Sequence, residues 1–283
     1  PCMKNLPHVL AVQDISCVGR CSLTAVLPLF SAAGIECSVL PTALLSTHTG
    51  GFGQNTFLDL TGQMAAILEH WQREGIVFDA LCTGYLGAPE QLEILRRWHA
   101  QNPSVTRLVD PVMADHGRLY KGFGPEHVQA IREWGRGADI LTPNMTEAML
   151  LADIPYREGP WASAFVEDLM QRLFSSTRAH SLVITGVSLD DHTLGSACCS
   201  EGGPVSYALT ERLPVSFPGT GDIFSAVVLA AILQGRTLAE AADTATHFTF
   251  SCIRDTIARH SDPRRGVEFE RHLTDLTVLA GLP

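Results

Sequence analysis

The stretch that decides the fold is Pro218-Gly219-Thr220-Gly221-Asp222, followed directly by an apolar run from Ile223 to Leu229. Its two glycines let the backbone approach a ligand closely, and a helix beginning at Gly221 would direct free N–H groups at an anion. Asp222 falls in the first turn of that helix, where a carboxylate stays ionised and can take a proton from a hydroxyl. The pattern is typical of phosphoryl transfer, although an ordinary glycine turn with an acidic helix start fits these five residues equally well.

The composition is that of a globular protein of one large or two smaller domains, with 283 residues, 46% apolar and 18% charged. The net charge of −10 comes without a basic tract, so we expect neither nucleic acid nor an anionic membrane surface as a partner. Apolar stretches stay shorter than the roughly 18 residues that span a bilayer, and the first residues lack a secretory apolar core. These features predict a cytoplasmic protein.

The eight cysteines are scattered and none forms a Cys-x-x-Cys pair, so we expect reduced, mostly buried thiols. Cys198 and Cys199 are neighbours whose side chains would diverge on a strand. Cys17 and Cys21 lie in a glycine-containing loop, where packing is the simpler role and a place in the wall of a ligand pocket is the alternative.

Short apolar runs alternate with amphipathic segments along the chain, which predicts repeated β–α units, an α/β fold and a largely parallel sheet. The predicted strands are 9–12, 37–40, 80–83, 108–109, 140–141 and 182–185, with an edge hairpin from 194–199 and 205–209. The predicted helices are 21–33, 57–71, 89–99, 125–134, 237–259 and 267–279. No linker or change of composition marks a second domain, so one domain is expected over residues 1–283.

The predicted strands end in hydroxyl, carboxylate and glycine residues, and ligands of open α/β sheets bind beyond those ends. In chain order the ends read Gln13-Asp14-Ile15-Ser16, Ser46-Thr47-His48-Thr49-Gly50, Gly84-Tyr85, Asp110-Pro111, Thr142-Pro143-Asn144, Thr185-Gly186 and the glycine turn. We therefore expect the functional site along this edge of the sheet.

Five motifs, in their order along the chain, resemble the ribokinase-like superfamily and specifically its vitamin B6 branch, the pyridoxal/pyridoxine/pyridoxamine kinases. They are Ser46-Thr47-His48-Thr49-Gly50, Thr83-Gly84-Tyr85-Leu86-Gly87, Asp110-Pro111-Val112-Met113-Ala114-Asp115, Thr142-Pro143-Asn144-Met145-Thr146-Glu147 and Gly219-Thr220-Gly221-Asp222. The resemblance spans most of the chain, from Val9 to Leu233. It implies a three-layer α/β/α kinase that uses ATP and Mg²⁺, phosphorylates a B6 vitamer and forms a homodimer, with a monovalent cation as a further candidate cofactor.

The resemblance gives each block a chemical role. Asp222 would take the proton of the acceptor's primary alcohol, while the N–H groups of Gly219, Thr220 and Gly221 would stabilise charge on the transferring phosphoryl group. The implied nucleotide-binding residues are Asp110, Asp115, Tyr120, Thr142, Asn144, Glu147, Thr185, Gly186 and Thr220. Residues 116–124 would form a flap that closes over the phosphates and excludes water.

Metal binding is expected from Asp110, Asp115 and Glu147, partly through water, because Mg²⁺ needs only a few carboxylates besides the nucleotide's phosphates. A turn residue before proline is the plainer role of Asp110, and a first-turn helix acid is the plainer role of Glu147.

The acceptor pocket is predicted from Asp14, Ser16, His48, Thr49, Tyr85 and Asp222. Tyr85 can pack on a planar pyridine, while Asp14 and Thr49 can hydrogen-bond its ring nitrogen or phenolic oxygen. His48 fits a ligand role and a role that only holds its own loop equally well.

The first strand end departs from the resembled B6 kinases, which carry Gln-Ser-His where this chain reads Gln13-Asp14-Ile15. The Asp14-x-Ser16 spacing is also similar to that of the hydroxymethylpyrimidine kinases, which supply the alternative substrate. A sugar or nucleoside kinase is less favoured, because residues 14–50 leave little room for a large lid. A catalytically silent nucleotide- or vitamin-binding regulator is the non-enzyme alternative, and the intact glycine turn with Asp222 argues against it.

Overall fold

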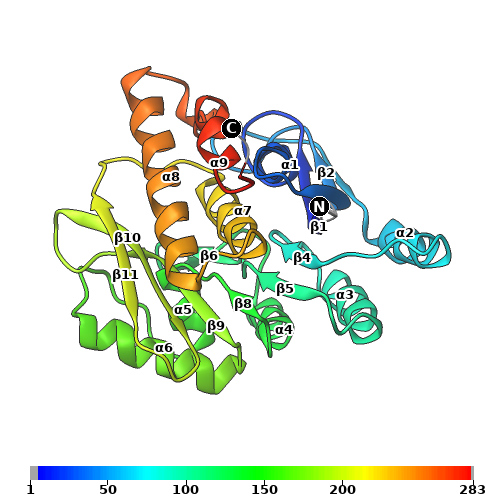
Figure 1. The fold of residues 1–283 in the computed structure, drawn as a ribbon, viewed down its shortest axis with the longest axis horizontal. Coiled ribbons are helices and arrows are strands. Elements are labelled where there is room, and N and C mark those ends of the chain that lie inside the picture. Colours follow the sequence, from blue (N-terminus) through cyan, green and yellow to red (C-terminus); the bar gives the residue numbers. More distant parts are fainter. Residues whose placement is uncertain (1–5, 282–283) are drawn as a thin grey trace.

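Nine strands form one sheet in the computed structural model, which describes residues 6–281 (Figure 1). The strand order is β11-β10-β9-β8-β5-β4-β1-β2-β3. The neighbours from β9 to β2 are all parallel, whereas the β10–β11 hairpin and β3 add antiparallel strands at the two edges. The predicted α/β class, the mostly parallel sheet and the edge hairpin are confirmed.

The strands of the sheet are β1 His8–Ser16, β2 Glu36–Leu45, β3 Phe57–Asp59, β4 Ala80–Thr83, β5 Thr106–Val109, β8 Ile140–Leu141, β9 Ser181–Val187, β10 Thr193–Ser200 and β11 Ser206–Glu211. A separate two-stranded ribbon consists of β6 Ala114–Asp115 and β7 Arg118–Leu119. The α-helices are α1 Leu23–Ala32, α2 Thr61–Arg73, α3 Pro89–Gln101, α4 Pro125–Gly135, α5 Met145–Leu151, α6 Ser163–Thr177, α7 Thr220–Leu233, α8 Leu238–Ala258 and α9 Leu273–Thr277. Two short 3₁₀ turns cover Pro263–Arg265 and Glu270–His272.

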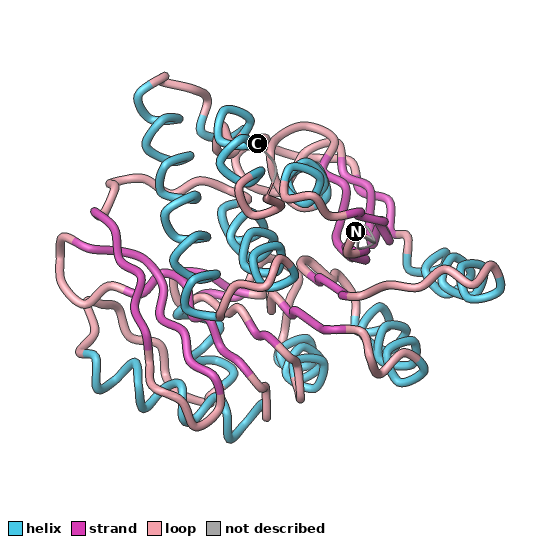
Figure 2. Tube along the Cα trace, viewed as in Figure 1, coloured by secondary structure: helices cyan, strands magenta, loops and turns pink. Residues whose placement is uncertain are grey.

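Helices cover both faces of the sheet and give the molecule three layers (Figure 2). One apolar core lies between the sheet and the group α2 to α6, and a second lies between the sheet and α1, α7, α8 and α9. Cys198 belongs to the second core and Cys199 to the first, so the two neighbouring side chains diverge across β10 as predicted. The predicted three-layer arrangement is therefore confirmed.

The order β4-β1-β2 creates a point where the chain changes direction across the sheet. After β1 the chain builds β2 and β3 on one side, and it then returns to place β4 on the other side of β1. Ligands of open α/β sheets bind at the carboxyl ends of strands beside such a point. Asp14 at the end of β1 and Tyr85 just after β4 both lie there.

Two predicted helices differ from the observed elements. The helix predicted for 57–71 begins only at Thr61, because Phe57–Asp59 pairs with β2 as the edge strand β3. The Asp59 carboxylate then accepts the Thr61 N–H at 3.0 Å and turns the chain into α2. The segment predicted as helical over 267–279 contains a 3₁₀ turn and only five α-helical residues, and α5 and α6 were not predicted.

None of the helices within residues 6–281 is long and apolar enough to cross a membrane. The seven cysteines of the described part of the chain are all free, in agreement with the predicted reduced thiols. Cys2 lies outside the described residues.

Candidate active site

The glycine turn packs backbone against backbone on the loop that follows β1. Gly219 has a φ of 81° and caps α7, which begins at Thr220, one residue before the predicted start. A Cβ at Gly219 would lie 2.2 Å from the carbonyl oxygen of Arg20 and 3.0 Å from the Cα of Cys21. Only glycine fits such a contact, so the turn fixes the first N–H groups of α7 next to the β1–α1 loop.

Asp222 is held in the first turn of α7 by a backbone donor. The N–H of Ser22 donates to its Oδ2 at 2.8 Å. Burial is the main cause that raises the pKa of the Asp222 carboxyl to about 7, and the nearby Asp14 carboxylate raises it further. A carboxylate with a pKa near 7 suits a general base at neutral pH.

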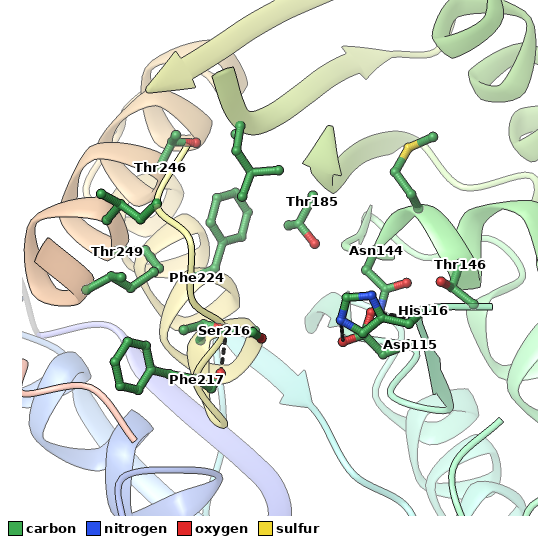
Figure 3. A pocket seen from close by; sticks show the side chains of 18 of the residues that line it. Asp115, His116, Asn144, Thr146, Thr185, Ser216, Phe217, Phe224, Thr246 and Thr249 are labelled. Atoms are coloured by element: carbon green, nitrogen blue, oxygen red, sulfur yellow. Dashed lines mark hydrogen bonds and ion pairs between the residues drawn. The ribbon is translucent and has the colours of Figure 1, made fainter. Parts of the chain in front are cut away.

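A cavity of about 870 Å³ opens in front of this turn, a size typical of small-molecule sites (Figure 3). Figure 3 shows Asp115, His116 and Asn144 on one side of it and Phe217, Phe224 and Thr249 on the other. The lining includes every residue predicted to bind nucleotide, namely Asp110, Asp115, Tyr120, Thr142, Asn144, Glu147, Thr185, Gly186 and Thr220. The fold thus brings together residues that span more than one hundred positions of the chain.

The wall opposite the carboxylates was not predicted. It includes the segment 211–218 and the α8 side chains Thr246, Thr249, Phe250 and Ile253. The segment 211–218 is the connection from β11 to α7, and the α8 residues read like any other helix face, so no motif marks either. More than half of these residues are apolar. Such a surface suits the planar base of a nucleotide, whose recognition needs apolar contact more than charge.

Asp110, at the end of β5, joins a buried chain of hydroxyl groups. The hydroxyl of Ser225 donates to Asp110 Oδ2 at 2.9 Å, and the hydroxyl of Thr142 lies 2.9 Å from that of Ser225. Ser225 lies three residues after Asp222 on α7, which places both on one helix face. Burial and the charge of Asp222 raise the pKa of Asp110. Ser225 is not among the predicted site residues, and its spacing from Asp222 is the one sequence signal that could have identified it.

Asn144 and Glu147 form a capping box at the start of α5. The Asn144 amide donates to the carbonyl of Ala114 at 2.8 Å, and the Glu147 carboxylate accepts the N–H of Met113 at 2.9 Å. The pair therefore fixes the base of the β6–β7 ribbon. Because backbone donors already occupy both Glu147 oxygens, any contact with a cation fits better through water.

The β6–β7 ribbon overlaps the first part of the predicted flap, and Tyr120 and Phe123 follow it within the flap. Asp115, nearly half-exposed, lies on the ribbon and accepts the N–H of His116 at 2.8 Å. Tyr120 lines the cavity, whereas the ring of Phe123 stacks on Tyr85 with 5.7 Å between the centroids. The flap therefore contacts the predicted acceptor residue as well as the predicted nucleotide side.

Among residues 6–281, Asp222 is the one predicted acceptor residue that lines the large cavity, whereas Asp14, Ser16, His48, Thr49 and Tyr85 are outside its lining. The Asp14 carboxylate accepts the hydroxyl of Ser16 at 2.9 Å and that of Ser22 at 2.6 Å. Burial is the main cause that raises the pKa of Tyr85 and of Asp222, and the Asp14 charge raises both further. Asp222 therefore lies between the cavity and this second group of polar side chains.

His48 uses both ring nitrogens on backbone groups. Nε2 donates to the carbonyl of Arg264 at 2.5 Å, and Nδ1 accepts the N–H of Gly50 at 3.1 Å. These bonds hold the loop that carries Thr49 against the C-terminal segment, which favours the loop-holding alternative for His48. Arg20 pairs with Glu270 at 2.5 Å and ties the β1–α1 loop to the same segment.

Comparison with known proteins places this geometry in a family. The family model described as phosphomethylpyrimidine kinase matches residues 23–264. The chain belongs to this family. The matched range includes the glycine turn, Asp222 and the candidate nucleotide-binding residues, although it begins just after Ser22.

Among the relatives of this family member are kinases of vitamin B6. The pyridoxine/pyridoxal/pyridoxamine kinase of Bordetella avium is 27% identical over 274 residues, which cover 88% of this chain and 85% of the relative. The crystal structure of pyridoxal kinase from Lactobacillus plantarum is 34% identical, covers 98% of both chains and gives a TM-score of 0.89. A Bacteroides thetaiotaomicron protein whose name assigns it to the phosphomethylpyrimidine kinases, solved with pyridoxal, is 35% identical and covers 96% of both chains with a TM-score of 0.90.

These similarities confirm the predicted ribokinase-like fold and the predicted enzyme class. The chain is an ATP-dependent phosphotransferase of the phosphomethylpyrimidine kinase family. The family's description and the names of its relatives point to two acceptors, a pyrimidine and a pyridine.

The oxygen ligands on the cavity wall fit Mg²⁺. Asp110 and Glu147 are buried carboxylates whose pKa values are raised mainly by burial, and further by the charge of Asp222 at Asp110 and by the charge of Asp110 at Glu147. A cation beside them would oppose these effects. Among the side chains of residues 6–281, no three His, Cys, Asp or Glu are arranged to enclose a metal ion. Mg²⁺ suits such a wall because it keeps water and phosphate oxygens as most of its ligands.

Proposed function

We propose that this protein transfers the γ-phosphoryl group of ATP to the 5′-hydroxymethyl group of pyridoxal, pyridoxamine or pyridoxine. The observation that carries the proposal is the place of Asp222, which lines the large cavity and is joined through Ser22 to the polar group around Asp14. ATP would occupy the cavity, and the acceptor ring would lie beside Asp14 and Tyr85.

In the proposed reaction, Asp222 accepts the proton of the acceptor hydroxyl. The alcohol oxygen then forms a bond to the γ-phosphorus while the bond from that phosphorus to the β–γ bridging oxygen breaks, and ADP leaves. The N–H groups of Gly219, Thr220 and Gly221 stabilise the charge on the transferring group. Closure of residues 116–124 excludes water, which limits hydrolysis of ATP.

An assay of ADP release separates the candidate functions. We expect release of ADP to be stimulated by pyridoxal, pyridoxamine or pyridoxine more than by hydroxymethylpyrimidine. A strong preference for the pyrimidine would replace the B6 assignment with the alternative kinase. If ATP binds and none of the four alcohols stimulates release, the silent regulator becomes the better description. Omitting K⁺ or Na⁺ in the same assay tests the candidate monovalent cofactor.

We propose Mg²⁺ as the divalent cofactor, held beside Asp110, with Asp115 and Glu147 acting partly through water. The Asp110→Asn variant keeps the size of the side chain and an oxygen that can accept from Ser225, but it loses the charge. We expect the Mg²⁺ concentration for half-maximal activity to rise at least about tenfold, since a charged ligand interaction is on the order of 1.5–3 kcal/mol. Titration of Mg²⁺ at saturating ATP and acceptor measures this, and an unchanged titration midpoint would place the cation elsewhere.

The proposal also includes one domain over residues 1–283, a cytoplasmic protein and a homodimer. The resemblance to the B6 kinases is the basis for the dimer, and the exposed edge strand β3 offers a surface for it. Phe57 and Leu58 on that strand are 54% and 55% exposed. Free cysteines are consistent with a reducing compartment.

A further inference from the structure

Ser22 contacts the two carboxylates on which the proposed function depends. Its N–H donates to Asp222 Oδ2 at 2.8 Å, and its hydroxyl donates to Asp14 Oδ1 at 2.6 Å. The residue is buried, and its contacts join positions 200 and 8 residues away in the sequence. One residue therefore bridges the base and the acceptor side.

The backbone of Ser22 is held in a conformation that favours glycine, with φ 49° and ψ −138°. Residues held in such sparsely populated regions gather at functional sites, where the surrounding structure fixes them. The loop 17–22 is constrained by its contact with Gly219, whose missing side chain leaves room for the Arg20 carbonyl. The strained backbone of Ser22 therefore lies in the same loop whose contact with Gly219 positions the start of α7.

Ser22 also gives up the usual role of a serine at its position. It is the N-cap residue of α1, where a serine oxygen ordinarily accepts an N–H from the first helical turn, yet no side-chain cap bond forms. Its hydroxyl instead donates its one proton to Asp14. The side chain of Ser22 is thus directed at the site and not at the first turn of α1.

Asp14 is fixed from both sides by this arrangement. Its second oxygen accepts the hydroxyl of Ser16 at 2.9 Å, so each carboxylate oxygen has one hydroxyl donor and keeps a lone pair for a ligand. In the described part of the chain no lysine or arginine pairs with Asp14. A donor N–H on the acceptor would supply the missing partner.

We propose that Ser22 is a positioning residue that holds Asp14 and Asp222 at a fixed separation, so that one acceptor molecule engages both carboxylates. The inference rests on the proposed function. An N–H or hydroxyl donor on the acceptor ring binds Asp14, and the hydroxymethyl group of the same molecule is thereby presented to Asp222.

The test compares Ser22→Ala with Ser31→Ala, a matched change at an exposed serine of the same helix. The acceptor is whichever of pyridoxal, pyridoxamine, pyridoxine and hydroxymethylpyrimidine the unmodified enzyme phosphorylates fastest. We expect Ser22→Ala to raise the acceptor KM about tenfold, the size expected for a hydrogen bond to a charged group, with the KM for ATP within about twofold. Ser31→Ala should change neither constant.

A double-mutant cycle with Asp14→Ala distinguishes positioning from a general effect on structure. If Ser22 acts through Asp14, Ser22→Ala adds less than about twofold in the Asp14→Ala background. Equal effects in both backgrounds, or a matching rise in the KM for ATP together with a lower melting temperature, would overturn the inference. If the pyrimidine is the preferred acceptor, the proposed B6 function fails while the cycle still tests Ser22.

Discussion

The Asp222→Asn variant is expected to lose at least about two orders of magnitude in kcat, because proton transfer by a positioned base contributes on that scale. Asparagine keeps an oxygen that can accept the Ser22 N–H, so the β1–α1 loop and the start of α7 should stay in place. Affinity for a non-hydrolysable ATP analogue should therefore change by less than about threefold, since the cavity wall is otherwise intact. Steady-state kinetics and calorimetric titration of the analogue measure the two effects.

The Asp222→Asn variant is expected to be more stable than the wild type at alkaline pH. The folded protein raises the pKa of Asp222 from its ordinary 3.8 to about 7, so the folded state binds this proton more tightly than the unfolded state. The contribution of Asp222 to the wild-type free energy of unfolding consequently falls as pH rises from about 4 to 7. Above that range the folded state holds a buried charge, which lowers its stability. At pH 8 we expect Asp222→Asn to be more stable by roughly 1–4 kcal/mol, with the difference vanishing near pH 4.

Denaturant unfolding at pH 4, 6 and 8 tests this, with Asp191→Asn on an exposed loop as the matched control. In the wild type, kcat/KM should rise with pH through about 7, because only the ionised carboxylate accepts a proton. A variant that loses stability and activity in parallel at every pH would assign Asp222 a structural role instead.

The sequence was informative wherever a function depends on the end of a strand. Parallel strands bring their carboxyl ends to one edge, so the strand pattern alone predicts that Asp14, Asp110 and Thr185 lie along the same edge of the sheet. The edge hairpin was equally predictable, since alternation and the intervening glycines are local signals. The beginning of α2 was not, because Phe57 and Leu58 join a strand only through their pairing with Leu44 and Leu45.

The roles of individual polar groups depended on contacts that a sequence does not display. His48 and Glu147 have the residue types of ligands, yet backbone groups already occupy their polar atoms. Ser22 and Ser225 have the types of ordinary helix residues, yet their partners are Asp222 and Asp110, distant in the chain. Residue type and spacing predicted where the chemistry lies, whereas the hydrogen bonds decide which groups remain free for it.

Two glycine-to-alanine changes in the glycine turn are compared with a third at Gly235, beyond the end of α7. Gly219→Ala places a Cβ 2.2 Å from the Arg20 carbonyl oxygen at a φ of 81°, so it combines a backbone clash with strain. Gly235→Ala has a φ of 85°, and apart from its chain neighbours no atom of residues 6–281 lies within 4 Å of its Cβ, so it carries strain alone. Gly221→Ala has an ordinary φ, and among the described residues its Cβ meets only Asp110 Oδ2, at 3.7 Å, so it carries neither.

We expect Gly219→Ala to lower kcat by about two orders of magnitude or more, because the displaced loop moves the Ser22 N–H away from Asp222 and small misplacements have effects of that size. Its melting temperature should fall further than that of Gly235→Ala, whose strain is on the order of 1–2 kcal/mol. Gly221→Ala keeps its N–H and should lose less than about tenfold in kcat. If kcat and melting temperature fall by similar amounts in Gly219→Ala and Gly235→Ala, backbone strain alone explains the requirement for glycine. The packing of the turn on the β1–α1 loop would then not contribute to catalysis.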